Sequence, residues 1–286
     1  MTLKAAVLIL AYKYPAGVAA LSRYLPPEHF DIFVHVDAKV DIAPFLKSVE
    51  ASPAVSFIEQ RITVFWRGWT MIEATMNLIQ AAKRHRYYDS FVLLSDDSVP
   101  IVSPQVLVRT LQKFPTMIQL SDHQERRWRY DKFFMFDSFV TQLRPTGVRE
   151  VTDDAIERFE RLIALRRRGK VPLDVFYEGS QWMALSKEAV GHVLKTWAAD
   201  EWLRESFEFS DAPDESYLQT ILGRSGLYKP KTLMKVDWSV PVPPRIYSSI
   251  AELETIEGRE ELFARKVDLK PADLDDWIAR MSADTG

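Results

Sequence analysis

The chain of 286 residues contains no cysteine. This absence excludes disulfide-stapled scaffolds, cysteine-ligated zinc, iron–sulfur clusters and thiol nucleophiles. Glycine is scarce, with ten residues that form neither a G-x-G-x-x-G fingerprint nor a P-loop, so nucleotide phosphates would need other partners. None of the five histidines pairs with another at the i, i+4 spacing, which argues against a zincin-type metal site. We therefore expect no bound metal.

Long apolar runs and a dominant charge are missing as well. The longest apolar stretches, such as Ala5–Ala11, are far shorter than the ~18–20 residues that span a bilayer, and no secretory pattern opens the chain. Thirty-seven Lys and Arg stand against forty Asp and Glu, a net charge of −3, so the whole protein is not expected to attract nucleic acid or anionic membranes. The expectation is a cytoplasmic protein with no transmembrane segment and no nucleic-acid partner.

What the sequence does contain is an average globular composition, with 47% apolar and 27% charged residues. Short apolar runs alternate with longer amphipathic segments, which predicts an α/β fold. Strands are expected at 5–11, 32–36, 55–58, 90–94, 181–185 and 234–238. Helices are expected to begin at Pro15, at a capping box from Thr70 to Glu73, near Lys187, near Glu215 and at Pro271. We expect one domain over 1–286, with a nucleotide-binding half to about 120 and an acceptor half after it.

The middle of the chain is rich in arginine, at 125–129 and 166–170, around a predicted helix whose Ile156, Phe159 and Ile163 face inward. This segment is interpreted as an insertion or lid. A nucleic-acid-binding role for it is disfavoured, because the overall charge is acidic and no recognised binding motif is present.

Carboxylates follow two of the predicted strands. Asp37 ends one strand, where α/β proteins contact nucleotides, although a loop-capping role is equally consistent. Asp96 and Asp97 follow another, where nucleotide-sugar enzymes often carry a metal-chelating Asp-x-Asp. Because the spacing here differs, contact with a donor sugar or turn chemistry is favoured over metal binding.

Other candidates lie in the second half. Asp214 and Glu215 open a helix, where acids complement the helix dipole or, in a cleft, act as a general base. Arg245, Arg265 and Lys266 are either solvated surface cations or partners of a diphosphate. Eight tryptophans supply aromatic faces that suit sugar rings, with core packing as the alternative.

Taken together, these segments resemble the Core-2/I-branching β-1,6-N-acetylglucosaminyltransferase family, glycosyltransferase family 14, which includes peptide O-xylosyltransferases and plant relatives. The matching blocks follow the family order over nearly the whole chain. They are Phe33-Val-His-Val-Asp37, Trp66-Arg-Gly-Trp-Thr-Met-Ile-Glu-Ala-Thr75, Phe91-Val-Leu-Leu-Ser-Asp-Asp-Ser-Val-Pro100, Gly179-Ser-Gln-Trp-Met-Ala-Leu-Ser186, Pro213-Asp-Glu-Ser-Tyr217 and Leu262-Phe-Ala-Arg-Lys266.

The resemblance implies a GT-A-like nucleotide-sugar-binding fold with a mixed, mostly parallel central sheet flanked by helices and a helical Arg-rich insertion. It implies inverting, metal-independent transfer from a UDP-sugar, GlcNAc being favoured, to a hydroxyl of a glycan or polysaccharide, free or lipid-linked. No cofactor is expected. The resemblance implies Glu215 as catalytic base, Asp37 as a uridine contact, Trp238 as an acceptor-side aromatic, and cations at the diphosphate, namely Lys266, Arg265 and Arg245. Besides these, Asp96 and Asp97 are expected at the donor and Trp182 at the substrate.

Two alternatives stay open at this point. The enzyme could use UDP-xylose, because the block that contains Asp96 and Asp97 is closer to the plant relatives than to the animal pattern. The chain could also be a UDP-sugar-binding partner protein without catalysis, which the presence of Glu215 argues against. Animal members carry an N-terminal anchor and many disulfides, and their absence here favours a cytoplasmic enzyme of bacterial type.

Overall fold

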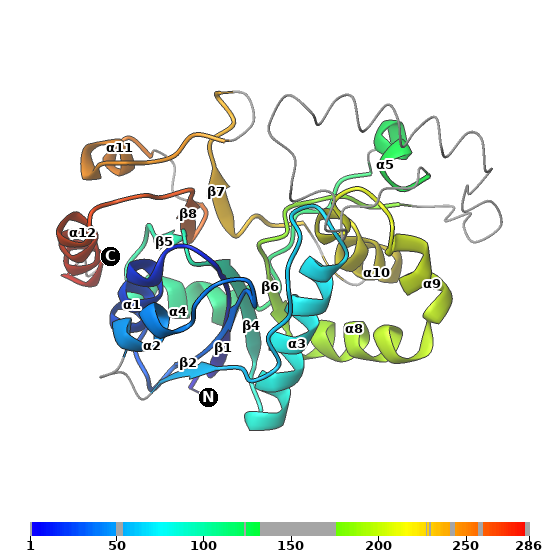
Figure 1. Ribbon diagram of the computed structural model, residues 1–286, viewed down its shortest axis with the longest axis horizontal. Helices are drawn as coiled ribbons and strands as arrows, with labels where there is room; N and C mark the ends of the chain where they lie inside the picture. The colour runs from blue at the N-terminus through cyan, green and yellow to red at the C-terminus, as the bar shows by residue number, and fades with distance from the viewer. Residues whose placement is uncertain are drawn as a thin grey trace.

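The computed structural model describes residues 2–49, 54–122, 124–131, 176–226, 228, 230–240, 244–256 and 260–283. Its centre is a five-stranded sheet with the strand order β3-β2-β1-β4-β6 (Figure 1). The strands are β1 (Ala5–Ala11), β2 (Phe30–Val36), β3 (Val55–Phe57), β4 (Ser90–Ser95) and β6 (Ala184–Ser186). The first four are parallel, and β6 pairs antiparallel with β4. The prediction of a mixed, mostly parallel central sheet flanked by helices is confirmed.

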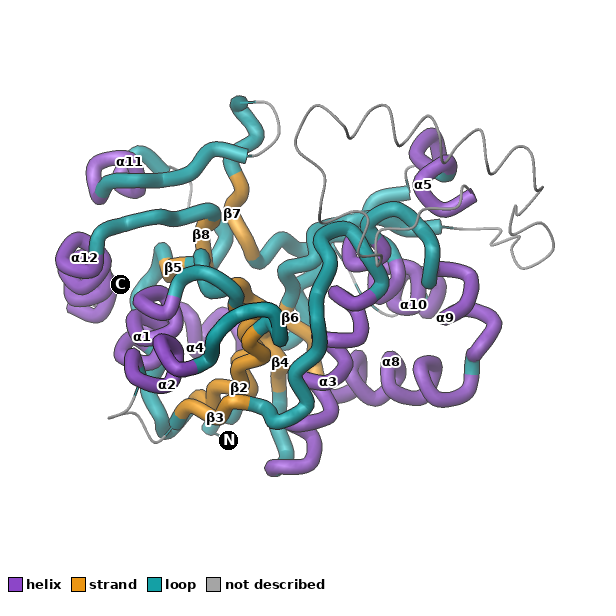
Figure 2. Tube along the Cα trace, in the orientation of Figure 1, coloured by secondary structure: helices purple, strands orange, loops and turns teal. Residues whose placement is uncertain are grey.

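Helices cover both faces of this sheet (Figure 2). The three helices that connect the parallel strands are α1 (Pro15–Tyr24), α2 (Ala43–Ser48) and α3 (Thr70–His85). Right-handed crossovers place α1 and α2 on one face, and because the strand order reverses between β1 and β4, they place α3 on the other. All seven residues of β1 are buried, as expected for a central strand that is covered on both sides.

The second half adds helices and a smaller sheet. Its helical elements are α4 (Pro104–Lys113), η1 (Gln124–Arg126), α5 (Trp128–Asp131), α8 (Lys187–Ala199), α9 (Glu201–Phe207), η2 (Pro213–Glu215), α10 (Tyr217–Ser225), α11 (Ile250–Glu254) and α12 (Pro271–Ala283). The smaller sheet has the order β5-β8-β7, from β5 (Val99–Pro100), β8 (Phe263–Arg265) and β7 (Met234–Val236).

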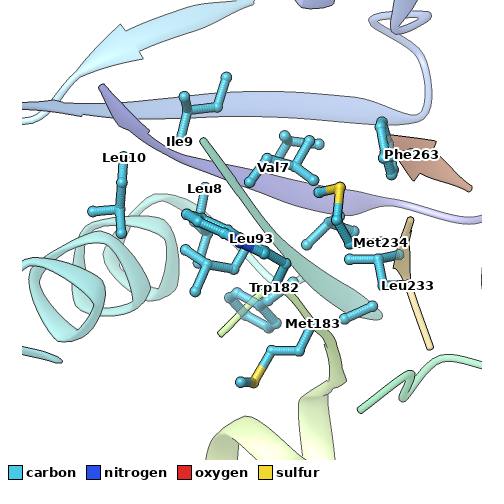
Figure 3. Close-up of a cluster of buried hydrophobic side chains, with 14 of the residues drawn as sticks. Val7, Leu8, Ile9, Leu10, Leu93, Trp182, Met183, Leu233, Met234 and Phe263 are labelled. Atoms are coloured by element: carbon cyan, nitrogen blue, oxygen red, sulfur yellow. The ribbon is translucent and has the colours of Figure 1, made fainter. Parts of the chain in front are cut away.

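One apolar core joins the two sheets. Figure 3 shows side chains of β1 and β4 beside Trp182 and Met183, with Leu233, Met234 and Phe263 next to them. The smaller sheet is thereby packed against the central sheet. Helix α12 packs against α1 and returns the end of the chain to the first half.

Most predicted elements are confirmed, and His35 packs in the sheet as expected. It is buried, its Nε2 accepts from the Ile62 amide at 3.1 Å, and burial lowers its pKa to about 4. The capping box is wrong. Thr70 is already helical, and its hydroxyl accepts instead from the Phe65 amide at 2.9 Å.

Two further expectations differ from the structure or lie outside it. The strand expected at 181–185 is shorter, because pairing with β4 begins only at Ala184. Most of the Arg-rich segment, including Ile156, Phe159, Ile163 and the cluster at 166–170, lies outside the described residues. No helix in the described ranges is both long and apolar enough to cross a bilayer.

Candidate active site

The carboxyl ends of β1 and β4 lie side by side at the point where the strand order reverses. In open α/β sheets, ligands bind in the crevice that diverging connections leave at such a point. Residues 12–14 follow β1, and Asp96 and Asp97 follow β4. These two segments form the floor of the candidate site.

Asp96 holds the loop after β1. Its Oδ2 accepts from the backbone amides of Tyr12, Lys13 and Tyr14 at 2.8–2.9 Å. Burial raises the pKa of its carboxyl, in spite of these three donors. A Cβ on Gly17 would lie 1.9 Å from the Asp96 carbonyl oxygen, so only glycine lets α1 start this close. The structure therefore gives Asp96 a role in shaping the loop that presents Lys13.

Asp97 is fully buried and organises three neighbours. Its Oδ1 accepts from the Ser95 hydroxyl at 2.6 Å and from two guanidinium nitrogens of Arg265 at 3.0 and 3.1 Å. Its Oδ2 lies 3.3 Å from Lys13 Nζ. Burial alone would favour the neutral acid, but Arg265, Ser95 and Lys13 lower the pKa of Asp97. The Arg265 guanidinium also lies 4.4 Å from the ring centroid of the buried Trp182, so Trp182 supports the cation from below.

Lys266 adds a cation beside this group. Its side chain is half-buried, and burial, followed by the nearby Arg265 charge, lowers its pKa. Within the described residues its ammonium has neither a hydrogen bond nor an ion pair. Lys13 and Arg265 both pair with Asp97, and Lys266 lies beside them without an ion pair of its own among the described residues. The excess positive charge fits an anion such as a diphosphate.

The guanidinium of Arg245 has carboxylate partners of its own. Its Nη2 lies 3.2 Å from Glu252 Oε1, and its Nη1 lies 3.7 Å from Asp237 Oδ2. Two residues on, the Tyr247 amide donates to the Lys266 carbonyl at 2.8 Å. The backbone thus brings the Arg245 segment next to Lys266, while the Arg245 guanidinium is paired with Glu252 and Asp237. Trp238, in the preceding loop, is 62% exposed.

Asp37 directly follows β2, next to the start of the loop after β1. Its amide donates to the Ala11 carbonyl at 2.9 Å. One carboxylate oxygen accepts from the Lys39 amide, and the other pairs with Lys39 Nζ, both at 2.9 Å. Asp37 thus lies on the same sheet edge as Asp96 and Asp97, which is the placement that the predicted nucleotide contact requires.

Asp214 and Glu215 face opposite ways from a tight turn. Ala212 has a left-handed backbone conformation, with φ of 49°, and the short helix η2 follows directly. The Glu215 side chain is 43% exposed, and its Oε2 accepts from Arg129 Nη2 at 2.8 Å. Asp214 points inward, and its Oδ1 has no partner among the described residues. Burial, together with the Glu215 charge, raises the pKa of Asp214 to about 7.

Residues 179–182 form a short segment between the turn at Glu215 and the cations Lys13, Arg265 and Lys266. At one end, the Gly179 amide donates to the Glu215 carbonyl at 2.9 Å. At the other end, Trp182 lies under Arg265. The Cα atoms of Gly179 and Trp182 are three peptide units apart and so lie within about 11 Å of each other. This segment therefore links the backbone of the Glu215 turn to the aromatic ring beside Arg265.

The same segment is fixed from below by Gln219, a buried residue of α10. Its Nε2 donates to the carbonyls of Ser180 at 2.9 Å and Asp214 at 3.2 Å. A Cβ on Gly179 would lie 1.8 Å from the Gln119 carbonyl oxygen. These contacts explain why the block from Gly179 contains a glycine that another residue could not replace without movement.

Four site residues were not identified from the sequence. They are Lys13, Arg129 and two buried acids that pair with Arg129, Glu178 at 2.7 Å and Asp211 at 3.6 Å. Lys13 follows a buried strand as Asp37 and Asp96 do, and that position could have indicated it. Arg129 lies in the arginine cluster at 125–129 that was interpreted as a lid. No spacing or composition signal indicates the buried acids that pair with it.

Comparison with known proteins gives a family match. The family described as Core-2/I-Branching enzyme matches residues 18–258. No curated protein is significantly similar to the chain. Among solved structures, a cytidylyltransferase from Leptospira borgpetersenii is 13% identical with a TM-score of 0.30, covering 78% of this chain and 95% of that one; so distant a likeness carries no argument. In the described part of the chain no three His, Asp or Glu side chains are arranged to hold a metal ion, and metal independence stays a prediction.

Proposed function

Since this chain belongs to the Core-2/I-branching enzyme family, a group of glycosyltransferases, we propose that it transfers a sugar from a UDP-sugar to a hydroxyl of a glycan. The transfer inverts the anomeric carbon and needs no metal ion. GlcNAc is the favoured sugar, and the acceptor is a glycan or polysaccharide, free or lipid-linked.

The observation that carries this proposal is that one short segment of the chain links the turn of a half-exposed carboxylate to a group of cations. Glu215 uses only Oε2 to bind Arg129, and its Oε1 has no hydrogen-bond partner among the described residues. The Gly179 to Trp182 segment links the turn that carries Glu215 to the ring beside Arg265. We infer that the donor and acceptor together span Glu215 and the cations Lys13, Arg265 and Lys266.

These positions match the two needs of an inverting transfer. Glu215 takes the proton from the acceptor hydroxyl as its oxygen bonds to the anomeric carbon. The bond between that carbon and the diphosphate oxygen breaks, and UDP leaves with additional negative charge. Lys266, Arg265 and Lys13 stabilise that charge in the transition state.

The remaining predicted residues take supporting roles in the proposal. Asp37 contacts the uridine, while Asp96 and Asp97 act through Lys13 and Arg265 rather than on the sugar directly. Arg245 would have to exchange Glu252 or Asp237 for the diphosphate. Trp238 exposes an aromatic face suited to an acceptor sugar, and Trp182 acts beneath Arg265.

The test is a transfer assay with UDP-GlcNAc, UDP-xylose and other UDP-sugars on a glycan acceptor panel, comparing the native enzyme with Glu215→Gln. We expect Glu215→Gln to lose about 10²–10⁴-fold in kcat, with donor affinity nearly unchanged. Asp214→Asn is the matched control, because it removes an adjacent carboxyl group that faces the interior, and it is expected to retain transfer.

Two outcomes contradict the proposal in different ways. Native transfer by Glu215→Gln would remove the base assignment. UDP binding without transfer from any donor would favour a UDP-sugar-binding partner protein instead.

A further inference from the structure

A continuous series of ion pairs runs from Arg67, in the loop before α3, to the Glu215 carboxylate. Arg67 contacts both carboxylate oxygens of Asp211, with Nε at 2.6 Å from Oδ1. Asp211 Oδ2 lies 3.6 Å from Arg129 Nε, and Arg129 Nη2 donates to Glu215 Oε2 at 2.8 Å. We call these four residues the arginine–carboxylate relay.

The backbone holds the relay together as well. The Asp211 amide donates to the Arg129 carbonyl at 2.6 Å, and the Ala212 amide donates to the Arg67 carbonyl at 3.1 Å. Arg67 and Ala212 both have left-handed backbone conformations, with φ of 67° and 49°. Residues other than glycine rarely adopt that conformation, and they do so where their surroundings impose it.

Neutralising buried charge does not by itself explain the contact with Glu215. Asp211 and Glu178 are almost completely buried and need a cation, which Arg129 supplies, with Nη1 at 2.7 Å from Glu178 Oε1. Glu215 is 43% exposed, so water can solvate it. The contact with Arg129 instead fixes the position of a side chain that solvent would leave free to rotate.

Arg129 is suited to this task by its charge and its shape. Burial works against its charged form, but Glu215, Asp211 and Glu178 raise its pKa and keep it a cation. A planar guanidinium can direct separate N–H groups to separate carboxylates, which a lysine ammonium cannot do in the same fixed geometry. Because only Oε2 of Glu215 is engaged, Oε1 is left for an incoming hydroxyl.

We propose that Arg129, held in place by Asp211 and Arg67, is the positioning residue for the Glu215 carboxylate during transfer. The relay also gives a role to Arg67 of the Trp66-Arg-Gly-Trp69 block, to which the sequence assigned none. The inference rests on the proposed function, in which Glu215 is the base.

The kinetic test compares Arg129→Lys, Asp211→Asn and Arg67→Lys with the native enzyme. We expect Arg129→Lys to lower kcat by about 10–100-fold, since misplacing a catalytic group by ~1 Å has an effect of that order, while the KM for the UDP-sugar stays within about twofold of the native value. The other two variants should show smaller losses of kcat. Arg127→Gln is the control from the same segment. Its guanidinium lies over the Tyr130 ring at 5.6 Å, and we expect this variant to retain native kcat.

A second arm asks whether these effects pass through Glu215. In the Glu215→Gln background, adding Asp211→Asn or Arg129→Lys should lower the residual rate no further, since residues that act as a unit are not additive. A purely structural role predicts full additional losses. Thermal melting identifies any variant that fails to fold, in which case the remaining two carry the comparison.

A spectroscopic arm needs no activity. In ¹⁵N NMR spectra, Arg129 should show separate, slowly rotating Nη signals that are absent in Arg129→Lys and averaged in Asp211→Asn. Freely averaged signals in the native protein would overturn the relay. Native kcat in all three relay variants, with Glu215→Gln inactive, would overturn the positioning role and leave the proposed function intact, whereas native transfer by Glu215→Gln would remove the proposed base itself.

Discussion

Lys13 and Asp97 form an ion pair of 3.3 Å that joins the carboxyl ends of the two central strands, β1 and β4. The pair is asymmetric, since Asp97 is fully buried while Lys13 is 41% exposed. The other oxygen of Asp97 holds Arg265. Lys13 can therefore turn toward a bound anion while Arg265 keeps its position over Trp182.

This arrangement predicts which contacts distinguish UDP from uridine. Lys266→Ala should weaken UDP binding by about 10–100-fold, the range of one lost charge-assisted contact, with little effect on uridine. Lys13→Ala should have a smaller effect in the same direction, because solvent screens its charge. Isothermal calorimetry measures both, with the exposed Lys270→Ala as control. Asp37→Ala should weaken both ligands, and equal losses of UDP and uridine in Lys266→Ala would remove Lys266 from the diphosphate site.

Donor binding should not depend on a divalent ion. UDP is expected to raise the melting temperature by the same amount in EDTA as in Mn²⁺ or Mg²⁺, because cations of the chain neutralise the diphosphate. A ligand that binds only the folded state stabilises it by mass action, so a thermal-shift titration is a direct measurement. Stabilisation that appears only with metal would contradict this prediction and make Asp96 and Asp97 the first candidates for ligands.

The buried Asp214 makes stability depend on pH. Its pKa is raised by burial to about 7, so the folded state holds a proton that the unfolded state releases near pH 4. Its contribution to stability is therefore complete below about pH 4 and is lost as the pH rises through about 7. Relative to Asp214→Asn, the native free energy of unfolding should fall by a few kcal/mol between pH 5 and 8. Urea titrations at the two pH values measure it, and parallel curves for the two proteins would refute the assignment.

Two glycines give a matched test of the segment beside the Glu215 turn. Gly179→Ala would place a methyl group 1.8 Å from the Gln119 carbonyl oxygen, so we expect a loss of about 1–3 kcal/mol, the usual cost of overpacking, together with reduced transfer. Gly191 lies within α8 with nothing near its Cβ position, so Gly191→Ala should stabilise the protein by up to about 1 kcal/mol. Chemical denaturation of both variants checks the pair, and a Gly179→Ala variant as stable as Gly191→Ala would show that the segment is not tightly held.

The local elements could be predicted because local forces determine them. A continuous apolar run such as that of β1 is compatible with a buried strand and little else, and a proline such as Pro15 or Pro271 starts a helix because its ring already has the required φ. The same reasoning predicts that Asp37, Asp96 and Asp97 lie at one edge of the sheet, because neighbouring parallel strands end on the same side. Thr70 does not cap the helix, because its hydroxyl accepts from the Phe65 amide. That contact depends on the conformation of the loop before the helix.

Contacts between distant segments were decided only by the tertiary structure. The sequence placed Glu215 in a family block and Arg129 in an arginine cluster, but no pattern links two residues that meet only after the chain has folded. The family resemblance singled out Glu215, but residue type and position by themselves do not distinguish Asp214 from Glu215, which have similar chemistry and adjacent positions. Their difference comes from the turn at Ala212, which buries one carboxylate and directs the other toward Arg129. Sequence thus determined which chemical groups the site could use, and packing decided which of them meet, because burial and ion pairing depend on the position of every neighbour.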